Sequence, residues 1–420
     1  MRFDEVVVGS GLAALVATRR LQLAGRRPVL IWPGLSSLYF VYATIDVLGY
    51  LDAATAVPVG VPDAGIASLI AADPSHPFAR AGHPALRQGV GMLVDWLKEA
   101  GLDWQGSLAR NILLPTAIGT AKPSCLVPAS MAAGDLEIPN PIVLCGFEGY
   151  EDFVPELAAS NLSRAWAHPV QSVRVQLPGF HAGRQFSSID VARRFEDEAF
   201  LAETAQRVLA AIAGAEGFRI GVPAVLGLTR DREVHARFQD ALGRPVFEIP
   251  TLPPSVPALR LFDRLRKHLQ EGGVEVIWGA PAHAAEVANG RCLRISIKSA
   301  GKERPVEGQA YVLALEDAVD GAFRAGTETI HDPFFLSELS RVAAPAERTS
   351  ESLFEPQPFA STGYRITNRM QPAGEDGRPL AGNVFVAGGA IAGYDPTGTK
   401  SRGGLAIATG YRAAQEAMVA

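Results

Sequence analysis

The stretch that decides the fold is Val6-Val7-Val8-Gly9-Ser10-Gly11-Leu12-Ala13-Ala14, close to the start of the chain. An apolar run, two glycines and an alanine- and leucine-rich segment are typical of a strand, a tight turn and a helix. Gly9 permits the turn, Gly11 lets a phosphate approach the backbone, and Ala14 lets the helix pack closely on the sheet. The free N–H groups at the start of such a helix favour an anion. The alternative is a tight strand–helix turn without a ligand. We predict that the nucleotide-binding residues here are Gly9, Ser10, Gly11, Leu12, Ala13 and Ala14.

The following residues continue this pattern but lack one expected part. A helix from Leu12 to Ala24 is followed by a strand from Pro28 to Ile31, which completes a strand–helix–strand opening. The second strand should end in an acid that binds a ribose, yet the sequence there is Leu30-Ile31-Trp32-Pro33-Gly34. Losing a hydrogen bond to a charged group costs about 1.5–3 kcal/mol, roughly ten- to hundredfold in affinity. We therefore favour a flavin over NAD(P) and leave FMN open beside FAD. Trp32 is a candidate for packing on the flavin, or a core residue.

A second glycine motif lies near the end of the chain. Asn383-Val384-Phe385-Val386-Ala387-Gly388-Gly389 predicts a strand and a turn, and a helix from Gly404 to Met418 follows. In flavoproteins such a helix points its N-terminus at the flavin, and its dipole stabilises the reduced ring by about 0.3–1 kcal/mol. We predict one non-covalent flavin, FAD or FMN, between the two motifs. The cofactor-binding residues expected here are Gly388, Gly389, Gly403, Gly404 and Leu405.

Alternation of strand and helix patterns sets the expected fold class and domain organisation. We predict an α/β fold, a doubly wound (Rossmann-type) FAD/NAD(P)-binding flavoprotein with an inserted α/β cap domain. Residues 1–140 and 257–420 would form the flavin-binding domain, and residues 141–256 the inserted cap or substrate domain. Within the cap, Asp190 to Ala213 reads as one long helix and Tyr150 to Leu162 as another.

Composition excludes several classes of function. The chain has 420 residues, 48% hydrophobic and 20% charged, enough for a large core and unlike a disordered protein. A net charge of −5 gives no electrostatic basis for binding nucleic acid. The three cysteines (Cys125, Cys145 and Cys292) lie far apart without a CxxC pair, which argues against a disulfide framework, a zinc ribbon or an iron–sulfur cluster of its own.

The sequence also predicts a cytoplasmic protein. Met1-Arg2-Phe3-Asp4-Glu5 leads directly into a strand, so no secretory leader is expected. The most apolar stretch, Leu35 to Leu51, is interrupted by Ser36, Thr44 and Asp46, so no membrane span is expected.

Further motifs resemble a known family over nearly the whole chain. The sequence resembles the B subunits of anaerobic sn-glycerol-3-phosphate dehydrogenase, flavoproteins related to the fumarate-reductase and succinate-dehydrogenase flavoprotein class. The most specific run is Pro250-Thr251-Leu252-Pro253-Pro254-Ser255-Val256. The other matching motifs are Met1-Arg2-Phe3-Asp4 with the glycine turn, His76-Pro77-Phe78, Trp104-Gln105-Gly106-Ser107, Gly119-Thr120, and Gly393-Tyr394-Asp395-Pro396 leading to Gly403-Gly404.

The resemblance implies a subunit of a heteromeric complex of anaerobic respiration. A larger catalytic flavoprotein subunit would carry the glycerol 3-phosphate chemistry, and a cysteine-rich iron–sulfur subunit would pass electrons to membrane quinone. The chain would then lie on the inner face of the cell membrane, with membrane contact only through a partner. The family's B subunit is usually assigned FMN.

The sequence departs from the family at several places. Leu315-Glu316 stands where the family has Thr/Ser-Gly beside the flavin, so Glu316 either redirects the turn or marks altered cofactor binding. Lys122 stands where the family tends to have arginine, and Lys400 and Arg402 stand in a region that is usually glycine-rich. Two alternatives therefore stay open: a flavin-dependent dehydrogenase of another small hydroxy or amino acid substrate, and a scaffold subunit without flavin or activity.

The sequence offers several candidates for catalytic residues, each with a structural alternative. His76 is a candidate general base, because histidine titrates near neutrality, with a turn cap as the alternative. Arg260 is a candidate for pairing with a phosphate or carboxylate, with a solvated helix face as the alternative. Lesser candidates are His331 beside Asp332, His83 on the surface, Arg264, Arg266 and Lys267 as an anion or docking patch, Lys400 and Arg402 at the flavin edge, Tyr394-Asp395-Pro396 as a turn shaping the flavin pocket, and Tyr39 and Tyr42 as ring-packing residues. No metal site is predicted.

Overall fold

The computed structural model describes residues 2–34, 36–52, 57–180, 185–316, 322–337, 339–340, 342–352, 355 and 357–420. The chain divides into two compact units. The first comprises residues 1–38, 46–96 and 265–420, and the second comprises residues 39–45 and 97–264. The second unit thus begins earlier in the chain than the expected cap at residue 141.

The first unit is built on a seven-stranded sheet, in the order β11-β2-β1-β14-β13-β12, with β17 also paired to β14. The strands are β1 (Arg2–Val8), β2 (Val29–Trp32), β11 (Glu275–Trp278), β12 (Ala282–Ala288), β13 (Arg291–Ser299), β14 (Lys302–Ala314) and β17 (Val384–Ala387). Strands β11, β2, β1, β14 and β17 are parallel, whereas β12, β13 and the first part of β14 form an antiparallel meander. Because parallel strands end at one edge, the segments after β1, β14 and β17 meet there.

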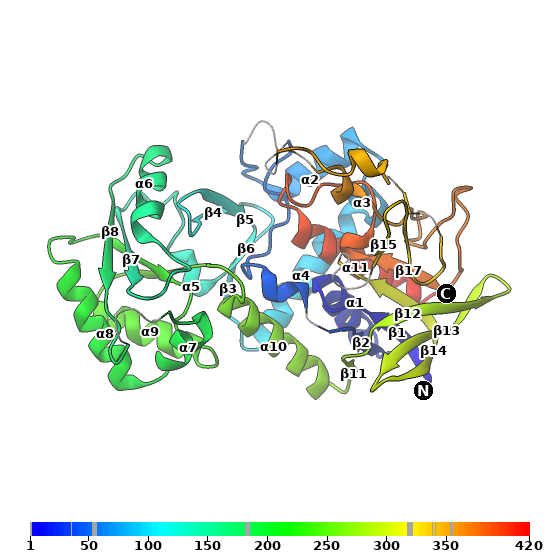
Figure 1. The fold of residues 1–420 in the computed structure, drawn as a ribbon, viewed down its shortest axis with the longest axis horizontal. Helices are drawn as coiled ribbons and strands as arrows, with labels where there is room; N and C mark the ends of the chain where they lie inside the picture. The colour runs from blue at the N-terminus through cyan, green and yellow to red at the C-terminus, as the bar shows by residue number, and fades with distance from the viewer. Residues whose placement is uncertain are drawn as a thin grey trace. The chain divides into compact units, whose positions relative to one another are not determined.

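The first unit contains five α-helices in its described residues, of which α1 and α11 pack on the sheet. They are α1 (Leu12–Leu23), α2 (Pro62–Ala72), α3 (Pro77–Ala81), α4 (His83–Glu99, whose last turn passes into the second unit) and α11 (Arg402–Ala417). Helices α1 and α11 lie side by side (Figure 1). Their contact is close because Gly410 of α11 has no side chain: a Cβ there would lie 2.5 Å from the carbonyl oxygen of Ala13. Two short strands, β15 (Arg324–Ala325) and β16 (Ile330–His331), form a separate ribbon.

The second unit contains a parallel four-stranded sheet in the order β10-β9-β7-β8. Its elements are β7 (Ile142–Phe147), α6 (Pro155–Ala165), β8 (Val170–Val175), α7 (Ser188–Arg194), α8 (Glu198–Ala211), β9 (Arg219–Pro223), α9 (Asp231–Leu242), β10 (Val246–Ile249) and α10 (Val256–Glu271, whose last turns pass into the first unit). In Figure 1, α6 covers one face of the sheet and α8 and α9 cover the other. The α/β, doubly wound class with an inserted α/β unit is confirmed.

A small antiparallel part precedes this sheet. It consists of β3 (Trp104–Gly106) with β6 (Leu126–Pro128), β4 (Ile112–Pro115) with β5 (Ala121–Ser124), and the one-turn helix α5 (Ala129–Ala132). The prediction of one helix from Asp190 to Ala213 is wrong, because the helix is interrupted at residues 195–197, between α7 and α8. Asp197 caps α8, accepting a hydrogen bond from the backbone N–H of Phe200 at 2.9 Å.

Candidate functional site

The first glycine corner joins β1 to α1 and lies against the end of β14. Gly9 has φ +146°, and a Cβ there would lie 2.0 Å from the carbonyl oxygen of Ala314. Both facts restrict position 9 to glycine. The Gly9 N–H donates to the carbonyl of Ile31 at 3.1 Å, which ties the corner to β2. Ser10 is fully buried, and its carbonyl accepts a hydrogen bond from Ser36 Oγ at 2.5 Å.

The second glycine corner follows β17 and lies on the other side of the end of β14. Gly388 has φ +81°, and its N–H donates to Thr409 Oγ1 of α11 at 2.9 Å. A Cβ at Gly389 would lie 2.0 Å from the carbonyl oxygen of Glu316, so this approach also requires glycine. The N–H of Ala390 then donates to the carbonyl of Leu315 at 2.9 Å.

The two corners adjoin each other within the first unit. A Cβ at Gly388 would lie 3.2 Å from the Cβ of Ala13. Segments from opposite ends of the sequence therefore form one site at the carboxyl edge of the parallel sheet, where α/β folds bind nucleotides. Leu12, Ala13 and Ala14 are buried at the start of α1.

The remaining predicted glycine residues begin α11. Gly404 packs on the Asp46–Val47 segment: its N–H donates to the Asp46 carbonyl at 2.9 Å, and a Cβ would lie 2.6 Å from the Val47 carbonyl oxygen. Leu405 is fully buried, whereas Gly403 is partly exposed. This tight packing fixes where the N-terminus of α11 begins.

Glu316 brings a carboxylate into the first corner. Its Oε1 accepts a hydrogen bond from the backbone N–H of Ala13 at 3.3 Å, and the residue is only 4% exposed. A Cβ at Gly11 would lie 2.2 Å from Glu316 Cγ, so this side chain fills the space that the missing Gly11 side chain leaves. The Glu316 carboxylate therefore lies among the glycines and helix amides that the sequence predicts to bind a phosphate.

Trp32 lies inside the protein at the end of β2. Its ring is fully buried, with its centroid 5.1 Å from that of Trp278. The indole N–H donates to the carbonyl of Gly34 at 2.6 Å. These contacts give Trp32 a core position and fix the turn that follows β2.

Two of the candidate histidines, His76 and His83, have internal side-chain partners. His76 caps α3, its Nδ1 accepting a hydrogen bond from the Phe78 N–H at 3.1 Å, and it is 8% exposed. His83 lies 2.8 Å from Asp63, which also binds Arg87 and has its pKa lowered chiefly by that arginine. His331 lies in β16, and the adjacent Asp332 accepts hydrogen bonds from the amides of its own turn.

Arg260 forms a buried ion pair in the second unit. Its guanidinium donates to both carboxylate oxygens of Glu248, at 2.7 and 3.1 Å, and to the carbonyl of Gly227 at 2.8 Å. Glu248 also accepts from Ser130 Oγ and from the N–H of Leu226. Burial raises the pKa of Glu248, but the charge and hydrogen bonds of Arg260 outweigh it, so the pKa lies below its usual value. The pair therefore stays ionised, and the arginine is committed to an internal partner.

The lesser candidates also have assigned contacts. In the second unit, Arg264 binds Asp231, Tyr39 packs on Phe262 at 5.0 Å, and Lys122 lies over the ring of Tyr42 at 5.1 Å. In the first unit, Arg266 lies over Trp278 at 5.0 Å, Lys267 lies 3.6 Å from Glu271, Lys400 has φ +48°, and Arg402 begins α11. The Asp395 carboxylate accepts from the amides of Thr397 and Gly398, which builds the expected turn beside Tyr394 and Pro396.

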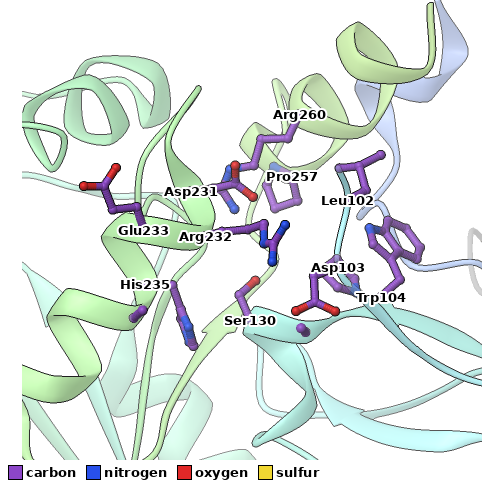
Figure 2. A pocket seen from close by; sticks show the side chains of 13 residues that line it. Leu102, Asp103, Trp104, Ser130, Asp231, Arg232, Glu233, His235, Pro257 and Arg260 are labelled. Carbon is purple, nitrogen blue, oxygen red and sulfur yellow. The ribbon is translucent and has the colours of Figure 1, made fainter. Parts of the chain in front are cut away.

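A cavity of about 450 Å³ opens in the second unit beside Arg260, the arginine of the buried pair with Glu248 (Figure 2). Asp103, Ser130, Asp231, Arg232, His235 and Arg260 are among its lining residues. Its charges are of both signs. The chemistry of this lining selects no single class of ligand.

No group of three metal-binding side chains occurs in the part of the chain that the structure describes. Cys125, Cys145 and Cys292 are buried, and burial raises the pKa of Cys145 and of Cys292 to about 12. Within the described ranges, no helix is long and apolar enough to cross a membrane.

Comparisons with known proteins agree with this geometry. Residues 4–405 match the family described as FAD binding domain. The probable B subunit of the anaerobic glycerol-3-phosphate dehydrogenase of Halobacterium salinarum is 30% identical over 98% of this chain and 96% of its own length. The chain belongs to this family of B subunits. The B subunit of the Yersinia enterocolitica enzyme is 28% identical over 99% of this chain and 98% of its own length.

Membership of this family confirms a flavin as the cofactor class and flavin-dependent oxidoreductases as the enzyme class. Among solved structures, a 3-ketosteroid Δ1-dehydrogenase from Sterolibacterium denitrificans is similar with a TM-score of 0.45 and 11% identity, covering 100% of each chain.

Two residues that shape the sites were missed by sequence reasoning. Thr409 binds the second glycine corner from α11, and a threonine within a helix pattern gives no signal of this role. Glu196 precedes α8, and its Oε1 accepts from the amides of Leu228, Thr229 and Arg230 at 2.6–3.1 Å. Only the fold brings that carboxylate to the loop between β9 and α9.

Proposed function

We propose that this chain is the flavin-carrying B subunit of a heteromeric, quinone-linked dehydrogenase. The complex oxidises sn-glycerol 3-phosphate to dihydroxyacetone phosphate, releasing two electrons and two protons, and the same numbers reduce a quinone to a quinol. The observation that carries this proposal is similarity to the B subunits of glycerol-3-phosphate dehydrogenases over 98% of this chain.

The glycine corners are the part of the chain that would hold the flavin. The backbone at Gly9 and Gly11 and the first amides of α1 would bind its phosphate. Gly388 and Gly389 leave room at the opposite corner, and the N-terminus of α11 contributes a partial positive charge. The flavin supplies two-electron redox chemistry when bound. The chain's own residues orient it and keep water away from it.

Electrons would leave this chain for a partner protein or a soluble acceptor. Among the described residues no metal cluster can be built, and the three cysteines are buried thiols. We propose a cysteine-rich iron–sulfur subunit as the acceptor and a larger flavoprotein subunit as the place of alcohol oxidation. The contacts of His76 and Arg260 support that division, because both side chains have internal partners. The subunit would sit at the cytoplasmic side of the membrane, bound there through its partners.

Purification of the intact complex tests the proposal. Glycerol 3-phosphate is expected to bleach the flavin of this chain when the larger subunit is present and not when the chain is alone. Bleaching of the isolated chain by another hydroxy or amino acid would instead support a separate dehydrogenase. A complex that turns over without flavin in this chain would support the scaffold alternative, which the position of Glu316 favours.

A further inference from the structure

The carboxylate of Glu316 stands at the place where a phosphate enters a glycine fingerprint. Ala13 is the second residue of α1, and its N–H is one of the helix amides without an acceptor inside the helix. Glu316 Oε1 accepts this N–H at 3.3 Å. In the fingerprint, these same amides and the open space above the second glycine receive the phosphate.

The overlap is steric as well as electrostatic. Glu316 Cγ, Cδ and Oε1 would lie 2.2, 2.7 and 2.4 Å from a Cβ at Gly11. The same Oε1 would lie 3.3 Å from a Cβ at Gly388, so the carboxylate lies between the two corners. With the side chain in this position, a phosphate and the carboxylate compete for one space and one donor.

The backbone of Glu316 is held in place, and Oε1 of its carboxylate accepts the long hydrogen bond from Ala13. The close approach of Gly389 to the Glu316 carbonyl and the hydrogen bond from Ala390 to Leu315 hold the main chain in place. The hydrogen bond from the Ala13 N–H to Glu316 Oε1, at 3.3 Å, is at the long end of the usual range. Rotation of the side chain alone would clear the corner.

Glu196 provides an internal contrast in the second unit. Its carboxylate also lies at a loop before a helix, but it accepts three backbone amides at 2.6–3.1 Å and the hydroxyl of Thr229. That carboxylate is a structural acceptor for the amides of the loop between β9 and α9. The bond from Ala13 to Glu316, at 3.3 Å, is longer than each of these amide bonds, so an incoming anion competes for it more readily.

We propose that Glu316 is a cofactor-affinity determinant: its carboxylate occupies the phosphate position of the flavin-free chain and must be displaced when a flavin nucleotide binds. Flavin affinity is therefore lower than the glycine corners alone would give. This inference rests on the flavin of the family and does not depend on the substrate proposed above.

Titration of the flavin-free, full-length chain with FAD and with FMN tests this role, with flavin fluorescence quenching as the readout. Glu316→Ser removes both the charge and the bulk, whereas Glu316→Gln removes the charge and keeps the shape. We expect Glu316→Ser to lower the dissociation constant by about tenfold or more, and Glu316→Gln to lower it by a smaller factor. Circular dichroism verifies the fold of each variant.

Glu416→Gln is the matched control, because Glu416 is a buried carboxylate of the same unit, paired with Arg369 and Arg412 at the far end of α11. Its dissociation constants should equal those of the unaltered chain. Dissociation constants for both Glu316 variants within twofold of the unaltered chain would overturn the inference, as would absence of flavin binding in every variant. The proposed substrate and partners are tested separately, by reduction of the intact complex, so either result can stand without the other.

Discussion

Replacement of Arg260 by methionine is the most informative single change in the second unit. Arg260 and Glu248 are 4% and 0% exposed at the side chain, with 2.7 Å between Nη1 and Oε2. Removing one partner of a buried ion pair leaves the other charge without compensation and costs about 3–5 kcal/mol. Arg260→Met should therefore lower the free energy of unfolding by about that amount.

A double variant separates the charge effect from lost packing. Glu248→Gln combined with Arg260→Met removes both charges, yet the glutamine oxygen can still accept from Leu226 N–H while its amide NH2 donates to Ser130 Oγ. This variant should recover at least half of the loss, because no buried charge stays unpaired. The assay is urea unfolding followed by circular dichroism, with hydrogen exchange of the Leu226 amide as a local readout.

The same pair sets a pH dependence. The pKa of Glu248 in the folded chain lies below its usual value. The ionised carboxylate therefore contributes its full stability at any pH above the usual pKa. This stability is lost as the pH falls through the lowered pKa. The double variant should lose less stability on acidification than the unaltered chain.

Two results would refute this reasoning about Arg260. One is a loss below about 1 kcal/mol in Arg260→Met, which is the size expected of an exposed pair. The other is a double variant no more stable than the single one. A residue that only contacts substrate would instead raise KM and leave the unfolding curve unchanged.

Three further outcomes follow from other contacts. Glu196→Ala should destabilise the chain by about 1–3 kcal/mol in urea, because it removes the acceptor of three amides; an unchanged midpoint would contradict this. Arg219→Met should cost more than about 2 kcal/mol, since the guanidinium donates to four carbonyls of residues 133–140, and hydrogen exchange there should accelerate; unaltered exchange would count against it. The three buried thiols should resist a thiol reagent at pH 8 until the chain unfolds, and rapid labelling of the folded chain would disagree with that.

The glycine corners could be predicted from sequence because their constraint is local. Gly9 must adopt φ +146°, and a run of valines before it and alanines after it identifies the strand and the helix. The bounds of helix α9 (Asp231–Leu242) likewise follow from local signals, because it is regularly amphipathic and ends at Gly243, whose φ is +63°. Local geometry and periodicity carry such predictions.

The features that could not be predicted from the sequence depend on contacts between residues that are distant along the chain. The sequence predicts one helix from Asp190 to Ala213, but Asp197 is a capping residue whose role is visible only once a new helix begins at Glu198 and the Phe200 N–H needs an acceptor. The charge on Arg260 suggested an anion site, but its partner Glu248 lies in β10, on the other side of a proline-rich run. Glu316 was noticed as a departure, whereas its contact with Ala13 needed the pairing of β1 and β14.

The measurement that tests the central claim most directly is the flavin content of the chain purified with its partners. After the chain is separated from the larger flavoprotein subunit under conditions that keep its flavin bound, acid release followed by chromatography should yield one flavin per chain. That flavin should be lost in Gly9→Ala and Gly389→Ala, where a Cβ would lie 2.0 Å from a carbonyl oxygen, and retained in Gly91→Ala, where nothing lies within 4 Å. A chain isolated with its partners but without flavin, or full flavin retention in both corner variants, would contradict the account.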